Sequence, residues 1–224
     1  MAALIWDETG KRFYENGVDH GVLYVMDDNG AYGKGVAWNG LISVSESPEG
    51  AEPNDLYADN IKYATLRSAE TFGATISAYM HPDEFALCDG SAQIAKGVYA
   101  GQQERRSFGF AYRTNIGNDT GTSKDDGYKL HICYGLTASP AEKSYETIND
   151  SPDAITFEWE VSSIPVQIAG YKPTSSLVID SRVADPTKLK QLEEKLFGNA
   201  TTEATLPDPA TIITLMGVTS EVSQ

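Results

Sequence analysis

The residues that could perform catalytic chemistry are few and scattered along the chain. The 224 residues include three histidines, His20, His81 and His131, and two cysteines, Cys88 and Cys133. One residue separates His131 from Cys133, and at that spacing two side chains of a β-strand share a face. A nucleophilic Cys–His pair is therefore conceivable. The polar side of an ordinary alternating strand explains the same spacing more simply, and we favour that interpretation.

Metal and phosphate sites are not indicated by any motif. No two histidines or cysteines have a zinc-site spacing such as CxxC or HExxH. Residues 118–127, NDTGTSKDDG, lack the Asp/Asn ladder and closing glutamate of a calcium loop. Residues 29–35, NGAYGKG, lack the Ser or Thr of a phosphate-binding loop. The sequence thus predicts no catalytic residue, no metal and no cofactor. A pair of carboxylates for glycoside hydrolysis remains an open alternative, because the distance between two carboxylates in the fold is not visible in a sequence.

Composition narrows the classes of function. The formal net charge is -15, and an acidic chain is repelled by nucleic-acid phosphates and by anionic membranes, which argues against tight DNA binding. No apolar run of about 18 residues is present, so no membrane-spanning helix is expected. Residues 1–17 have no basic start followed by an apolar stretch of secretory length. We therefore expect folding in a cytoplasm, with both cysteines as free, half-buried thiols.

The candidate residues would be positioned by a β-rich fold. Residues 155–161 (ITFEWEV), 128–134 (YKLHICY) and 107–113 (SFGFAYR) alternate with the period of two expected of half-buried strands. In the third segment Gly109 and Ala111 form a face so small that we expect another layer to approach it closely. Further strands are predicted at residues 22–26, 36–44, 61–66, 71–79 and 177–183.

This pattern of short strands joined by loops rich in Gly, Asp, Asn and Pro favours a mainly β fold, an antiparallel β-sandwich or barrel, as one domain over residues 1–224. A flanking helix is predicted over residues 185–198, with Asp185 as N-cap, Pro186 in the first turn and Gly198 as the stop. A second helix of two turns is predicted at residues 82–90. The Thr-rich residues 199–224 need not be ordered, and ATIITLM at 210–216 is a candidate last strand.

Residues 45–60, SESPEGAEPNDLYADN, form the most unusual connection between two predicted strands. The segment contains two prolines and a glycine but no lysine or arginine. We expect a long acidic loop, because uncompensated carboxylates resist collapse onto a core. Its five carboxylates and two large apolar residues are Glu46, Glu49, Glu52, Asp55, Asp59, Leu56 and Tyr57.

Five segments, in the same order through most of the chain, resemble the major tail protein of long-tailed bacteriophages of Gram-positive hosts, the subunit of the tail tube. They are WNGLISVSESPEGAEPNDLYADNIKY (38–63), ISAYMHPDEFALCDG (76–90), RRSFGFAYRTNIGNDTGT (105–122), GYKLHICYGLTASPAEKSYETINDSPDA (127–154) and KPTSSLVIDS (172–181). The shared order is more specific than any single motif. The predicted helix at 185–198 and the Thr-rich end match less distinctively.

The resemblance implies a structural virion protein without catalytic residues. Such proteins have a β-sandwich or barrel core with a flanking helix and form rings, generally of six, that stack into a hollow tube for genome delivery. The implied partners are other copies of the subunit, the tape-measure protein, the tail terminator and the distal tail protein. DNA would pass through without specific binding, and no cofactor or membrane is implied. The implied location is the virion tail tube, assembled in the host cytoplasm.

The resemblance also suggests roles for two sets of residues. In relatives the long loop between early strands reaches a neighbouring subunit or ring, which makes residues 45–60 a candidate assembly contact. We expect this loop to be mobile in the free subunit and to become ordered on assembly, because its five uncompensated carboxylates resist collapse. A DNA conduit must not bind DNA, so carboxylates lining the bore would favour passage. Glu158 and Glu160, which alternate with an aromatic face, are candidates for this lining, and a merely solvated face is the competing interpretation.

Two alternative functions stay open. A non-catalytic carbohydrate-binding β-module would account for the many aromatic residues and the acidic loops, and it requires exposed aromatic side chains clustered in a shallow site. A related tail protein, such as a tail terminator, would share the core fold.

Overall fold

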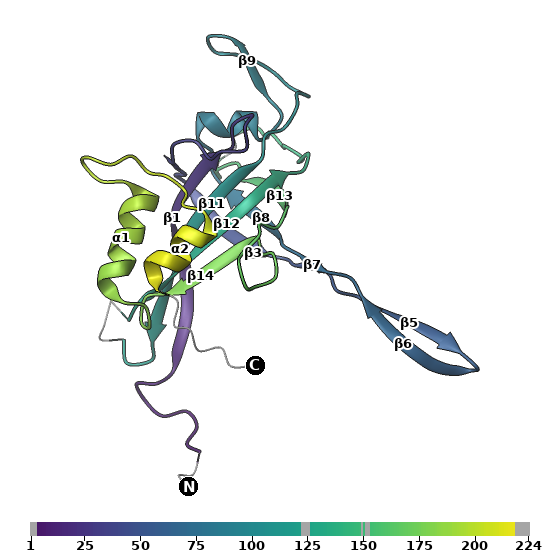
Figure 1. Cartoon of the computed structure of the whole chain (residues 1–224). Helices are drawn as coiled ribbons and strands as arrows, with labels where there is room; N and C mark the ends of the chain where they lie inside the picture. The colour runs from purple at the N-terminus through teal and green to yellow at the C-terminus, as the bar shows by residue number, and fades with distance from the viewer. Residues whose placement is uncertain (1–3, 122–125, 149, 151–152, 218–224) are drawn as a thin grey trace.

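One large antiparallel sheet forms the body of the molecule (Figure 1). The structure, a computed structural model, describes residues 4–121, 126–148, 150 and 153–217. Strand order in the sheet is β2-β1-β11-β12-β13-β8-β3, and β14 also pairs with β12. The strands are β1 (Phe13–Val25), β2 (Val36–Ala37), β3 (Leu41–Glu46), β8 (Gly73–Ala78), β11 (Phe108–Asn118), β12 (Tyr128–Ala138), β13 (Phe157–Ser163) and β14 (Ser176–Asp180). The predicted mainly β fold with a flanking helix is confirmed.

Strand β12 divides the sheet into two parts. Its first half pairs with β14, with Leu130 opposite Ile179. Its second half pairs with β13, with Ala138 opposite Val161. Gly135 lies between the halves with φ of 60°, a left-handed conformation that glycine adopts readily. A Cβ atom there would also lie 2.5 Å from the Ile164 carbonyl oxygen, so this glycine allows β12 to change partner.

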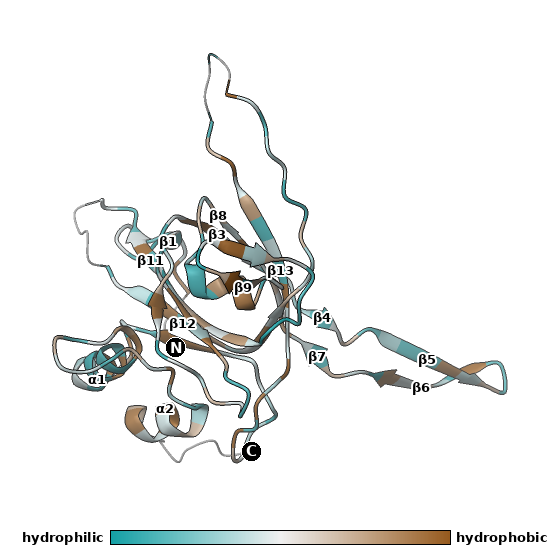
Figure 2. Ribbon diagram, turned by 90° about the horizontal axis from the view of Figure 1, so that it is seen from above, coloured by the Kyte–Doolittle hydropathy of each residue, from teal (hydrophilic) through white to brown (hydrophobic). Residues whose placement is uncertain are grey.

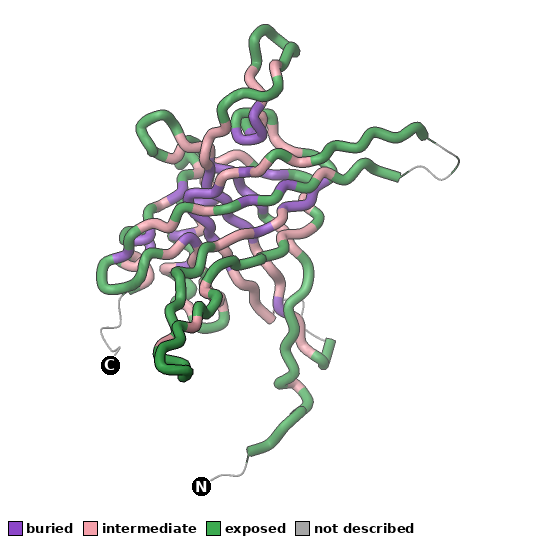
Figure 3. The backbone as a smooth tube through the Cα atoms, turned by 90° about the vertical axis from the view of Figure 1, so that its right-hand side faces the viewer, coloured by how far each residue is buried: buried purple, intermediate pink, exposed green. Residues whose placement is uncertain are grey.

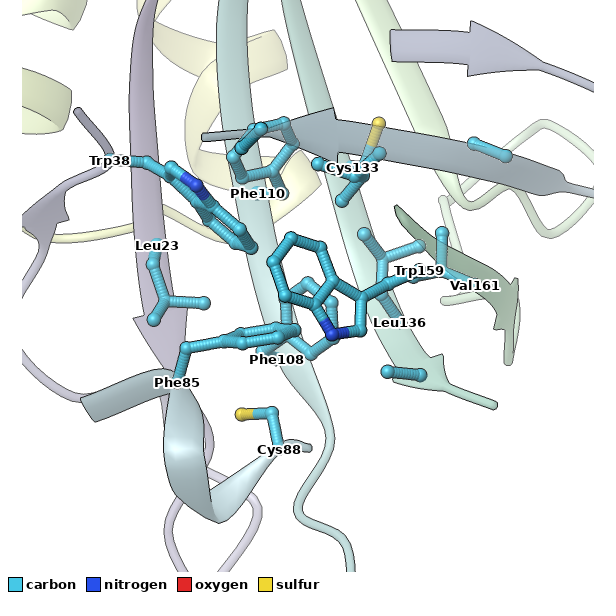
Figure 4. Packing of buried hydrophobic residues seen from close by; sticks show 14 of the residues in the cluster. Leu23, Trp38, Phe85, Cys88, Phe108, Phe110, Cys133, Leu136, Trp159 and Val161 are labelled. Atoms are coloured by element: carbon cyan, nitrogen blue, oxygen red, sulfur yellow. The ribbon is translucent and has the colours of Figure 1, made fainter. Parts of the chain in front are cut away.

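The inner face of the curled sheet holds an aromatic core (Figure 4). The Trp38 ring lies 4.6 Å from Phe85 and 5.6 Å from Trp159, measured between ring centroids. Phe85 belongs to a short 3-10 helix, η1 (Asp83–Leu87), which covers one end of the core. The alternation of Phe157, Trp159 and Val161 predicted from sequence is what brings these side chains inward.

The outer face of the sheet is covered by two helices, α1 (Pro186–Phe197) and α2 (Pro209–Met216). The leucine stripe predicted for α1 is buried against β12; its members are Leu189, Leu192 and Leu196, which pack with Leu130, Ile132 and Tyr134. Asp185 accepts hydrogen bonds from the amides of Thr187 and Lys188, which confirms its predicted role as N-cap. The predicted close approach at Gly109 is also present, because a Cβ atom there would clash with Leu206 of the segment before α2.

The predicted strand at 210–216 is wrong, because these residues form α2. Asp208 caps this helix by accepting from the Thr211 amide, and Pro209 occupies its first turn. Leu206 and Ile212 are buried, and Leu215 and Met216 pack beside them, so α2 and the residues just before it pack on the sheet. Residues 218–224, the end of the segment predicted to be flexible, lie outside the described residues.

Other differences from the sequence predictions are local. The predicted strand at 36–44 is interrupted at Gly40, which has φ of 75°, and the strand at 71–79 is split into β7 and β8. The predicted two-turn helix at 82–90 is the shorter η1. The hairpin of β9 (Ala92–Ala95) and β10 (Val98–Ala100) was not predicted. None of the helices in the described part of the chain has the length and apolar character needed to cross a bilayer.

The predicted acidic loop at residues 45–60 is instead part of a long β-hairpin. Two short ribbons, β4 (Glu49–Gly50) with β7 (Glu70–Thr71) and β5 (Pro53–Ala58) with β6 (Ile61–Arg67), follow one another away from the body. We call residues 47–72 the arm. Figure 2 shows it extending sideways from the sheet, and in Figure 3 buried residues are concentrated in the body, away from the projecting segments.

Candidate assembly site

The arm folds as a hairpin because its tip suits a tight turn. Ala58 pairs with Ile61, which leaves Asp59 and Asn60 as a two-residue connection. Both have positive φ, 50° and 63°. A turn of this type needs positive φ at both central residues, and Asp and Asn tolerate that conformation better than other non-glycine residues. The return strand therefore pairs directly with the segment that was predicted to be an open loop.

The outer ribbon of the arm has two different faces. Cross-strand partners share a face, so Leu56 lies beside Ala64, and Ala58 beside Ile61. Leu66 follows on the same side. This apolar face has little to pack against, and Leu56, Ile61 and Leu66 are 39%, 64% and 55% exposed. We define the apolar arm face as Leu56, Ala58, Ile61, Ala64 and Leu66; the polar Asn54, opposite Leu66, lies at its inner end.

The opposite face of the ribbon is polar. The Asp55 carboxylate receives the Lys62 ammonium at 2.8 Å and the Thr65 hydroxyl at 2.7 Å. These two partners lower the pKa of Asp55 from its ordinary value. The premise that the acids of this segment are uncompensated is therefore wrong for Asp55, because Lys62 on the return strand supplies a counter-charge.

The predicted assembly residues occupy different positions in the hairpin. Leu56 belongs to the apolar arm face, whereas Asp55 and Tyr57 lie on the opposite, polar face. The predicted carboxylates Glu49, Glu52 and Asp59 are exposed along the arm and at its tip. Sequence reasoning missed Ile61, Ala64 and Leu66. The signal that could have found them is the alternation on both sides of the Asp59–Asn60 dipeptide.

Glu46, the first predicted assembly residue, lies at the root of the arm and is tied to the body. The Tyr112 hydroxyl donates to its Oε1 at 2.6 Å. Nδ1 of His131 lies 3.5 Å from the same oxygen. Interaction with His131 and Tyr112 lowers the pKa of Glu46, although burial acts in the opposite direction. The end of β3 is thereby attached to β11 and β12 where the arm begins.

The candidate Cys–His pair is part of this buried region. His131 stacks on Tyr112 with ring centroids 4.5 Å apart, and its Nε2 is 3.1 Å from the Thr114 hydroxyl. Cys133 is in the aromatic core, so the interpretation of this strand side as a solvated polar face is wrong. Burial raises the pKa of Cys133 far above the ordinary thiol value, which keeps the sulfur protonated and a poor nucleophile.

The predicted lumen residues Glu158 and Glu160 are exposed on the side of the sheet that faces away from the aromatic core, whereas Ser77 beside them is buried. Glu158 is aligned with Ser77 and Glu160 with Thr75 across β13 and β8. The Ser77 hydroxyl donates to Glu158 at 3.3 Å. Ser43 and Ser45 of β3 extend the same two rows. These six positions contain carboxylates and hydroxyls only, and we call them the acidic sheet face: Ser43, Ser45, Thr75, Ser77, Glu158 and Glu160.

Open strand edges in the described part of the sheet include those of β1 and β14. Strand β2 pairs with β1 only at Val22 and Leu23. No strand in the described ranges pairs with the same edge of β1 over residues 13–19, or with the edge of β14 that faces away from β12. Unpaired strand edges of this kind are templates for pairing with another chain.

The other two histidines, His81 and His20, have contacts that suit a structural role. The His81 ring packs against Phe85, Phe157 and Trp159. His20 is hydrogen-bonded to the adjacent Asp19. Among the residues that the structure describes, no group of three or more metal-ligating side chains comes together.

The carbohydrate-binding alternative requires exposed aromatic side chains gathered in one place. The exposed Trp6 and Tyr57 lie on segments that extend in different directions from the body (Figure 1). Tyr63, on the same ribbon as Tyr57, is also exposed, and other exposed aromatic side chains are Tyr79, Tyr145 and Tyr171.

Comparisons with known proteins give little further information. No family model matches the chain, and no curated protein matches it. One solved structure with detectable likeness is the sheath-tube complex of an extracellular contractile injection system, PVC, in its extended state. The identity is 12% and the TM-score 0.30, over 72% of this chain and 88% of that one. At these values the likeness establishes neither a shared fold nor a function.

Proposed function

We propose that this protein is the subunit of a tail tube, a structural protein that assembles with copies of itself into stacked rings around a passage for DNA. The observation that supports this most directly is the arm. It carries an apolar face outside the body of the subunit. The sequence resemblance to phage major tail proteins agrees with the proposal.

Packing against a partner would stabilise the arm. A two-stranded ribbon is marginally stable in water by itself, because it has no core of its own. Burying a side chain such as Leu56, Ile61 or Leu66 on a neighbouring copy would contribute about 1.5–3 kcal/mol each if the burial were complete. A free-standing ribbon with one apolar and one charged face is therefore suited to lie on another surface.

The open strand edges suit ring formation. Strand β1 is antiparallel to β11, β11 to β12, and β12 to β14. The open edge of β14 in one copy can therefore pair antiparallel with the open edge of β1 in the next. Such a contact joins two different surfaces, so it repeats around a ring until the ring closes.

The acidic sheet face suits the wall of a DNA passage. Glu158 and Glu160 would repel phosphates over roughly 8 Å at physiological ionic strength. The absence of basic side chains at its six positions avoids the counterion release that gives DNA affinity. A tube reconstruction that placed both glutamates on the outer surface would refute this assignment.

The assembly proposal can be tested with variants on the two faces of the arm. The double substitution Leu56→Ser and Leu66→Ser removes much of the apolar arm face, whereas Arg67→Gln changes the polar face of the same ribbon. We expect the wild type and Arg67→Gln to form rings or tubes in negative-stain microscopy. The serine variant should sediment as a folded monomer with unchanged circular dichroism.

Equal assembly of all three proteins would show that the apolar arm face is not an assembly contact. Hydrogen exchange gives an independent measurement. Amides of residues 45–60 should be more protected in assembled material than in the monomer, because the ribbon gains a covering surface. Equal protection in both states would also contradict the proposal.

A further inference from the structure

Two more segments project from the body, at opposite ends of its strands (Figure 1). Residues 4–12 precede β1 and extend from one end of the sheet. The hairpin β9–β10 lies at the other end, shortly before β11 begins at Phe108. Strand β1 has 13 residues, which corresponds to about 43 Å at 3.3 Å per residue. The two segments are therefore separated by approximately the height of one subunit.

The N-terminal segment has a fixed root and an apolar tip. At the root, the Gly10 amide donates to Asp119 at 2.9 Å, and Asn118 donates to the Gly10 carbonyl at 3.0 Å. The tip consists of Leu4, Ile5 and Trp6, each at least 75% exposed. Fixing the root limits the directions in which these side chains can extend, and this lowers the entropy lost on binding.

The β9–β10 hairpin has the same organisation at the other end of the molecule. Backbone hydrogen bonds from Gln103 to Gly90 and from Arg106 to Leu87 hold its root. Ile94, Val98 and Tyr99 on the hairpin are all exposed. It is a second small ribbon with apolar side chains and little to cover them.

The charges at the two tips are complementary. Asp7 follows the apolar tip of the N-terminal segment, and Lys96 lies at the turn of β9–β10. In the described part of the chain, neither side chain has an ion-pair partner, whereas the neighbouring Glu8 is paired with Lys11 at 2.7 Å. An acidic group beside one apolar tip and a basic group beside the other would fix the register of a contact between them.

We propose that the N-terminal tip of one copy, Leu4–Ile5–Trp6 with Asp7, binds the β9–β10 hairpin of the copy in the next ring, with Lys96 facing Asp7. This inference rests on the proposed function. If lateral contacts follow the strand edges, the two ends of the strands face along the tube axis. The contact joins unlike surfaces and does not close on itself, so it propagates a stack of rings.

Charge reversal tests this pairing directly. Asp7→Lys and Lys96→Asp each place like charges at the contact, and the double variant restores opposite charges in reversed order. We expect each single variant to form rings, but to require about tenfold or more higher concentration to form tubes, because facing like charges are unfavourable. The double variant should recover tube formation. Glu8→Lys, beside the tip, is the control for a general change in charge.

Separate outcomes identify which proposal fails. If the wild type forms no rings, the proposed function fails and this inference fails with it. If rings form and both single variants make tubes at the wild-type concentration, only the axial contact is refuted. Failure of the double variant to recover, or an equal effect of Glu8→Lys, also overturns the specific pairing. Ile94→Ser and Trp6→Ser, which keep all charges, should likewise form rings and require a higher concentration to form tubes.

Discussion

Asp19 offers a quantitative test of how the edge strand β1 is held to the sheet. Its carboxylate faces Arg113 on β11 and accepts from the guanidinium at 2.9 and 3.3 Å. Asn115 donates to the same group at 3.1 Å. Burial raises the pKa of Asp19, but the hydrogen bonds from Arg113, Asn115 and His20 outweigh it and lower the pKa to about 2. The substitution Asp19→Asn removes the charge while keeping the shape.

The loss of unfolding free energy expected for Asp19→Asn follows from this pKa. A lowering from 3.8 to about 2 corresponds to about 2.4 kcal/mol at 1.36 kcal/mol for each factor of ten. The Asp19 side chain is 37% exposed, so solvent screening reduces the expected loss for Asp19→Asn to about 1 kcal/mol at neutral pH. Because the folded-state pKa is depressed, this stabilisation is complete above pH 3.8 and disappears as the pH falls towards 2.

Urea unfolding of the unassembled subunit, measured at pH 7 and again near pH 2.5, checks both parts of the prediction. The two proteins should differ by about 1 kcal/mol at neutral pH and converge in acid. Asp28→Asn is the matched control, because Asp28 meets Arg106 at 2.8 Å but is 85% exposed; it should have a smaller effect at neutral pH. A constant difference between wild type and Asp19→Asn across this pH range would refute the electrostatic reasoning.

Three further substitutions or reactions test the packing of the body. Gly109→Val should destabilise the fold by about 1–3 kcal/mol through overpacking against the segment before α2, whereas Gly101→Ala, where the added atom meets open space, should be near neutral in the same urea titration. Cys88 and Cys133 are buried and free, and burial raises the pKa of Cys88 to about 12, so thiol reagents at pH 8 should label neither residue until the protein is unfolded. Asp208→Ala removes the N-cap of α2 and should lower the free energy of unfolding by about 1 kcal/mol; an unchanged value would mean that the cap is dispensable.

Local signals in the sequence were sufficient to predict several main strands and the first helix of the body. Alternation with a period of two located the strands that became β11, β12 and β13, because large apolar side chains recur at every second residue and pack against a core. Helix α1 was predictable because Asp185, its leucine stripe and Gly198 all indicate the same boundaries. Alternation did not reveal that β12 is buried on both sides, and His131 was therefore assigned to a polar face.

The errors in predicted secondary structure arose where the local conformational preference of a segment competes with a capping signal or with pairing to a segment distant in sequence. Residues 210–216 are rich in β-branched side chains, which favour strands, yet the Asp208–Pro209 start and packing on the sheet make them helical. Residues 45–60 contain two prolines and five carboxylates, which suggest a loop, but residues 53–58 within them form a strand by pairing with β6. The apolar arm face becomes visible only when both strands are aligned.

The distribution of exposed apolar residues is compatible with the proposed assembly from separate subunits. The apolar arm face, the N-terminal tip and the β9–β10 hairpin are separate small surfaces, each weaker than a single large hydrophobic patch, and the net charge of -15 opposes non-specific association. In the proposed tube, one contact raises the local concentration for the next, so several weak contacts together give a stable assembly. Every copy in the tube repeats each contact. Weakening any one contact should therefore raise the concentration needed for assembly by a larger factor than it raises the dissociation constant of an isolated pair of subunits.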